Sequence, residues 1–193
     1  MPVGASGFQC AFLESYASFR STYTNEDWHR LWSSTTWWSD QMLYSERSVV
    51  QNTARALGLR VYPGEPLRID AALSPQSSTS WFPIHVALEH ENAPLTLANE
   101  IRALASIRAP LKVIITYALN DYRRPDQIVR DLPSKIASEL LSIDSLLGED
   151  SSTQYLFLIG KESPEREIQW WSMAFAANES LDGKEFLPTS YSN

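Results

Sequence analysis

The stretch Leu111–Leu119 constrains the fold more than any other part of this chain. Its residues are almost continuously apolar and several are β-branched, which is the composition of an interior strand covered on both faces. Pro110 comes directly before it and marks where the strand begins. A strand covered on both faces indicates an α/β protein, and we expect a mixed β-sheet flanked by helices.

Helical and extended patterns alternate around this strand. Residues 40–57 place apolar side chains at helical spacing, with Gly58 as the stop signal. The other elements that we expect are, in chain order, an extended stretch Leu59–Tyr62, strands Leu67–Leu73 and Phe82–Glu91, a helix Leu95–Ile107, a helix Pro125–Leu147, and strands Gln154–Gly160 and Glu167–Ala176.

A chain of 193 residues suits one domain with terminal additions. We expect residues 1–39 to form an aromatic-rich arm or cap, with a short helix Asn25–Trp32 opened by Asn25. Residues 40–178 would form the core, and residues 179–193 a poorly ordered tail. The chain has seven Trp residues, for which core packing is favoured over a base-stacking or partner surface.

Charge and cysteine content limit the classes of function. The net charge of −7 counts against a protein that holds nucleic acid by non-specific electrostatics, although a carboxylate metal site itself adds negative charge. The single cysteine, Cys10, excludes an internal disulfide and favours a reducing, cytoplasmic compartment. The N-terminus lacks a signal-peptide pattern, and the apolar stretches are shorter than the roughly 20 residues of a membrane span. We expect no membrane association.

Two acids on the expected strand Phe82–Glu91 form the core of a candidate site. Glu89 and Glu91 are two residues apart, so they lie on one face with Cα atoms about 6.5 Å apart. Two charges about 7 Å apart repel by roughly 2.4 kcal/mol at an effective dielectric of about 20, which favours a cation between them. Asp70, on the expected neighbouring strand, supplies a third carboxylate. Such oxygen ligands suit Mg²⁺ or Mn²⁺.

A solvated sheet face would also carry acids at this spacing, and that alternative stays open. The apolar opposite face of the strand favours a site, and Glu46 lies on the apolar stripe of the expected helix 40–57. A carboxylate that faces a core is costly unless it is paired or binds a metal ion. His90 lies on the apolar face of its strand, where we expect a packed core histidine and not a ligand.

The order of these motifs resembles the PD-(D/E)xK nuclease superfamily. The run Arg68-Ile-Asp70 precedes His85-Val-Ala-Leu-Glu89-His-Glu91, and a helix and the strand that begins at Leu111 follow, over about residues 40–120. The resemblance implies a restriction-endonuclease-like sheet with an αβββαβ core. Ile69 stands where the family usually has Pro, and Glu91 where it generally has Lys. Some restriction enzymes of the superfamily carry Glu-x-Glu at this position.

The resemblance also implies roles for individual residues. Asp70 and Glu89 would ligate Mg²⁺ or Mn²⁺, Glu91 would orient or deprotonate the attacking water, and Glu46 would be an accessory acid. Glu100 and Lys112 are further candidate accessory residues, Lys112 as a source of the missing positive charge. The implied function is a divalent-metal-dependent endonuclease that hydrolyses DNA phosphodiester bonds. Cutting both strands would favour a homodimer.

Two other functions remain open from the sequence. A nuclease-fold protein that has lost cleavage could act as a protein- or nucleic-acid-binding module. The pI of about 5.0, the Glu in place of Lys and the aromatic N-terminal region favour this second reading, with protein as the partner. A retaining glycosidase also uses paired carboxylates about 5–5.5 Å apart. The small domain, with no evident sugar groove, makes it the weakest of the three.

Overall fold

The described residues form one sheet of seven strands in the order β1-β2-β3-β4-β5-β6-β7. The computed structural model describes residues 3–32, 34–63, 68–80, 82–92, 97–118, 125–147, 152–163, 165, 167–181 and 183–189. The strands β3, β4 and β5 are parallel, and the other neighbours are antiparallel. In chain order the strands are β1 (Leu59–Pro63), β2 (Ala71–Pro75), β3 (Val86–Glu91), β4 (Leu111–Ala118), β5 (Gln154–Glu162), β6 (Ile168–Ala176) and β7 (Leu187–Pro188).

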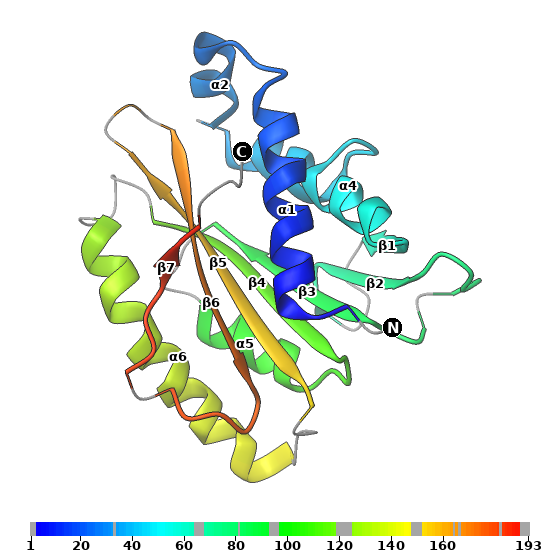
Figure 1. The fold of residues 1–193 in the computed structure, drawn as a ribbon, viewed down its shortest axis with the longest axis vertical. Helices are drawn as coiled ribbons and strands as arrows, with labels where there is room; N and C mark the ends of the chain where they lie inside the picture. Colours follow the sequence, from blue (N-terminus) through cyan, green and yellow to red (C-terminus); the bar gives the residue numbers. More distant parts are fainter. Residues whose placement is uncertain are drawn as a thin grey trace.

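Helices cover both faces of this sheet, which confirms the predicted mixed sheet flanked by helices. Figure 1 shows α1 and α4 on one side of the sheet and α5 and α6 on the other. The helices are α1 (Ala5–Arg20), α2 (Asn25–Trp32), α3 (Thr35–Ser39), the π-helix η1 (Asp40–Tyr44), α4 (Val49–Ala56), α5 (Leu97–Ala105) and α6 (Pro125–Leu147). Within the described residues, no helix is long and apolar enough to cross a membrane.

Aromatic side chains fix α1 to the sheet. Phe8, Phe12, Tyr16 and Phe19 recur at helical spacing and are buried in the core that α1 shares with the strands. The ring of Trp170 on β6 meets Phe12 edge-on at 4.8 Å and Tyr16 at 5.1 Å, both favourable geometries. Trp28, Trp38 and Trp170 are buried, as expected for core residues, whereas Trp37 is exposed.

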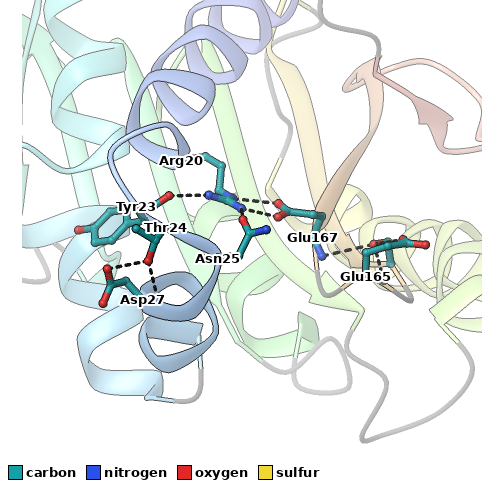
Figure 2. Close-up of polar contacts among 8 residues, drawn as sticks. Arg20, Tyr23, Thr24, Asn25, Asp27, Glu165 and Glu167 are labelled. Atoms are coloured by element: carbon teal, nitrogen blue, oxygen red, sulfur yellow. Dashed lines mark hydrogen bonds and ion pairs between the residues drawn. The ribbon is translucent and has the colours of Figure 1, made fainter.

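A polar network joins the end of α1 to the turn between β5 and β6 (Figure 2). Arg20 at the end of α1 forms an ion pair with Glu167, and its Nε donates to Glu167 Oε2 at 2.9 Å. Its other nitrogens donate to the carbonyl of Tyr23 and to Asn25 Oδ1, and its guanidinium lies 4.8 Å from the Trp28 ring. One charged group therefore links the end of α1 to the neighbouring helix α2 and to Glu167, which lies 147 residues further along the chain.

The helix Asn25–Trp32 has the predicted bounds, but the residue that caps its start is Thr24 and not the predicted Asn25. Thr24 Oγ1, and not the side chain of Asn25, accepts from the Asp27 N–H at 3.2 Å and donates to Asp27 Oδ2 at 2.8 Å. This reciprocal arrangement satisfies a backbone donor at the helix start. Asn25 instead accepts from Arg20.

The continuous helix predicted for residues 40–57 was wrong. The π-helix η1 ends at Tyr44, a turn follows, and α4 begins at Val49. Ser48 starts α4 because its hydroxyl accepts from the Gln51 N–H at 3.1 Å, which replaces a missing helical bond. Gly58 follows α4 with φ of 68°, which confirms it as the predicted stop.

The strand predicted for Leu67–Leu73 begins only at Ala71. Arg68 has φ of 68°, in the left-handed region, and this bend reverses the facing of the next residue. The alternating sequence pattern predicts that Ile69, Ala71 and Leu73 share one face of this strand. That prediction was wrong, because Ile69 is buried against α5 and α6, whereas Ala71 and Leu73 are buried on the α1 face. The same pattern predicts Ile84 on one face with Val86 and Leu88, but Ile84 is buried on the α5 and α6 side, because β3 begins only at Val86.

Several other predicted elements are confirmed. The helix Pro125–Leu147 has the predicted bounds, and β4, β5 and β6 lie where the sequence placed them. The predicted ends Leu67, Leu95 and Leu119 lie outside the described residues. The prediction of a poorly ordered tail was wrong for the described residues after Asn178, because Phe186 is buried and β7 pairs with β6.

Gly160 on β5 provides a test of the packing on the α1 face. A Cβ at this position would lie 2.8 Å from Tyr117 Cδ1 and 2.8 Å from Ile168 Cγ2. We expect Gly160→Ala to lower the free energy of unfolding by about 2 kcal/mol, because the core is overpacked. Gly7→Ala, in an exposed position of α1 with open space around its Cβ, should raise it by about 0.5 kcal/mol. Urea denaturation measures both, and equal effects would contradict the close approach at Gly160.

Candidate carboxylate site

Asp70 is bound to the end of β3 by two hydrogen bonds. The register Ala71↔Leu88 between β2 and β3 brings the bend before β2 beside the last residues of β3. The Asp70 N–H donates to Glu89 Oε2 at 3.2 Å, and the His90 N–H donates to Asp70 Oδ2 at 2.8 Å. The predicted proximity of Asp70 and Glu89 is therefore present, although Asp70 lies in a bend and not in a strand.

Glu89 carries its carboxyl group into the interior between the sheet and α5. The side chain is only 2% exposed, and within the described residues its Oε1 has no hydrogen-bond partner. Burial raises the pKa of the Glu89 carboxyl from 4.5 to about 9, and the negative charges of Asp70 and Glu100 add to this increase. A buried polar atom without a partner is rare and costly, so it marks a place where a ligand would be stabilising.

Two further acids complete a group from three segments. Glu100 lies in the first turn of α5, and its side chain reaches Glu89. Burial is the largest cause of a raised pKa for the Glu100 carboxyl, and the negative charges of Glu91 and Asp70 raise it further. Glu91, at the end of β3, is half-buried. We call Asp70, Glu89, Glu91 and Glu100 the carboxylate cluster.

The other two predicted site residues lie in different surroundings. Glu46 is in the exposed turn between η1 and α4, where its carbonyl accepts from Arg55, so the expectation that it faces the core was wrong. The helix that would have buried Glu46 is interrupted at this turn. Lys112 is buried, but its amino group donates to the carbonyl of Ala105 at 3.3 Å and the hydroxyl of Tyr155 at 3.4 Å. The amino group of Lys112, which belongs to β4, lies beside the last turn of α5, whereas Glu100 lies in the first turn.

His90 supports the cluster from the opposite face of β3. Its Nε2 is 2.8 Å from the hydroxyl of Tyr117, and burial lowers the pKa of His90 to about 3, so the ring is neutral. This confirms the predicted core histidine. The Asn92 side chain also donates to Ser39 Oγ at 3.1 Å, which ties α3 to the chain just after β3. No sequence pattern indicated this contact.

The donor set suits a hard divalent cation. Carboxylate oxygens are the ligands that Mg²⁺ and Mn²⁺ prefer, and a cation would neutralise the mutual repulsion of the cluster and bind the orphaned Glu89 Oε1. In the described part of the chain, no three His, Cys, Asp or Glu side chains are arranged so that they could hold a metal ion. The residue types of the cluster suit a divalent cation, whereas their arrangement among the described residues is not that of a formed metal site.

Comparison of this chain with protein-family models, with curated proteins and with solved structures gave no match. The function is consequently inferred from the residues and from the geometry of the carboxylate cluster.

The buried Glu89 carboxyl predicts an unusual pH dependence of stability. The folded protein holds the proton until about pH 9, whereas the unfolded chain releases it near 4.5. The protonated Glu89 carboxyl therefore contributes its full share to the free energy of unfolding below about pH 4.5, and this contribution is lost as the pH rises through about 9. The side chain of Glu89→Gln cannot ionise. Without metal, the free energy of unfolding of this variant should therefore exceed that of the parent by about 3 kcal/mol at pH 7.

Chemical denaturation of metal-free protein between pH 5 and pH 9 measures this difference. The exposed Glu185→Gln is the matched control and should keep the pH dependence of the parent. If Glu89→Gln and the parent lost stability in parallel over this range, the carboxyl of Glu89 would not be the buried, protonated group described above.

Proposed function

We propose that this protein is a divalent-metal-dependent endonuclease of the PD-(D/E)xK type, which hydrolyses phosphodiester bonds in DNA. The observation that carries the proposal is the buried Glu89 carboxyl, which has an unpartnered oxygen and lies beside Asp70 and Glu100. An ionised acid with a purely structural role would be paired with a cation or exposed to water. This one is surrounded by other acids, which is the arrangement that a divalent cation stabilises.

The order of elements supports this proposal. The run α4-β1-β2-β3-α5-β4 has the αβββαβ order that the family resemblance implies, with β3 and β4 parallel. Asp70 comes directly before β2, and Glu89 and Glu91 lie at the end of β3. The resemblance puts the first acid on a strand and the other two on the next strand, so Glu89 and Glu91 match this pattern and Asp70 lies one residue before the strand. A fold of this kind hosts other functions, so the acids carry the argument more than the topology does.

The cluster divides into ligands and a base. Asp70 and Glu89 would hold Mg²⁺ or Mn²⁺, with Glu100 beside them. When bound, such an ion polarises a phosphate and makes its bound water more acidic. Glu89 would give up its proton on binding, because only the carboxylate is a ligand. Glu91 is half-buried at the end of the strand, where it would accept a hydrogen bond from the attacking water and take its proton.

Cleavage of supercoiled plasmid DNA in Mg²⁺ or Mn²⁺ tests the proposal. We expect Asp70→Ala and Glu89→Ala each to reduce cleavage at least about 100-fold, because each removes a ligand, and a chelator should abolish cleavage by the parent. Glu185→Ala, an exposed acid near the far edge of the sheet, should cut like the parent. Parent-level cleavage by both cluster variants would sink the proposal.

A binding module on the same scaffold is the second candidate function. It is favoured by the net charge of −7 and by the finding that, among the described residues, no group of three His, Cys, Asp or Glu side chains could hold a metal ion. In that case the Glu89 carboxyl would stay protonated as a neutral buried group, and the partner would be a protein. Calorimetric titration with Mn²⁺ separates the two functions, because the module would give no heat of binding.

A further inference from the structure

Arg68 has a backbone conformation that its side chain does not favour. It is the one non-glycine residue with positive φ among those that the structure describes, at 68°. In this left-handed region the Cβ of an ordinary residue is crowded, so Gly or Asn is the usual choice. Strain of this kind persists only where the surroundings hold it, and it is concentrated at functional sites.

The neighbours of Arg68 hold it in this conformation. Ile69 is fully buried against the α5 and α6 face, and Asp70 is fixed to β3 by its two hydrogen bonds. The chain must therefore turn sharply just before Asp70. The turn leaves Arg68 exposed, two residues before Asp70, whose hydrogen bonds join it to Glu89 and His90 near the end of β3.

The guanidinium of Arg68 is not used in the described part of the fold, where it has no hydrogen bond or ion pair with another residue. Arg55, in contrast, donates to Asn52 and to the carbonyl of Glu46, and Arg20 pairs with Glu167. Lys112, the predicted source of positive charge, is directed to Ala105 and Tyr155. Arg68 is therefore an exposed cation two residues before Asp70 of the carboxylate cluster, and its guanidinium has no structural partner among the described residues.

We propose that Arg68 binds a phosphate of the DNA backbone next to the bond that is cut, which supplies the positive charge that Glu91 does not. This inference rests on the proposed nuclease function. A planar guanidinium makes paired hydrogen bonds to phosphate oxygens and stays charged at all relevant pH values. A chain with a net charge of −7 repels DNA, so such a contact beside the acids contributes strongly to binding.

The strained backbone allows a test that separates binding from folding. Arg68→Gly removes the guanidinium but suits positive φ, so its melting temperature should equal or exceed that of the parent. Arg68→Lys keeps a charge without the planar fork. Arg108→Ala is the matched control, because Arg108 is also exposed but lies before β4, at the opposite end of the parallel strands from Glu91.

Binding of a fluorescein-labelled DNA duplex is measured by anisotropy in Ca²⁺, and plasmid cleavage is measured in Mg²⁺. We expect Arg68→Gly to weaken binding about tenfold and to lower the slope of log affinity against log salt by about one, with a similar loss of cleavage. Arg68→Lys should recover part of the binding, and Arg108→Ala should match the parent.

The outcomes distinguish the two proposals. If Arg68→Gly bound and cut DNA like the parent, the role of Arg68 would be overturned while the nuclease function stood. If Arg68→Gly and Arg108→Ala were weakened equally, the effect would be general electrostatics and the assignment would also fail. If the parent neither bound nor cut DNA while its cluster bound Mn²⁺, the nuclease function would fail, and the phosphate contact with it.

Discussion

Glu89 brings a carboxyl group into the layer between the sheet and α5, where Asp70 and Glu100 add negative charge and its Oε1 has no described partner. Desolvation and like charge both oppose ionisation here, so the metal-free site holds a proton on Glu89. A divalent cation offers the other solution, since it compensates several carboxylates at once. Competition between a proton and a cation for the same oxygens is thus the physical basis of the proposed chemistry.

The rest of the fold positions this carboxyl group. Asp70 is attached to β3 through the backbone of Glu89's neighbour His90, and His90 meets Tyr117 on the opposite face. Tyr117 belongs to the aromatic core under α1, where Gly160 leaves room for its ring. The aromatic N-terminal region therefore supports the end of β3, and the Arg20 network holds that region to the turn after β5.

Long periodic patterns made β4 and α6 predictable, because an unbroken apolar run or a long amphipathic stripe has few alternatives. The break before α4 was missed because Leu43 and Val50 keep helical spacing across it. The run Ser48-Val-Val-Gln51 is a helix-start signal that would have shown it. The acids Asp70 and Glu89 were paired correctly from strand order. The conformation of Arg68 follows from tertiary contacts of Ile69 and Asp70, which no local pattern encodes.

The most direct measurement of the central claim is the number of protons released when Mn²⁺ binds. Calorimetric titration at pH 7 in two buffers of different ionisation enthalpy gives this number. Glu89 is protonated in the metal-free protein, and a carboxyl group must lose its proton before it can bind a metal ion. The account therefore predicts release of about one proton for each ion bound. It also predicts that Glu89→Gln releases none. Mn²⁺ binding without proton release, or no binding at all, would contradict it.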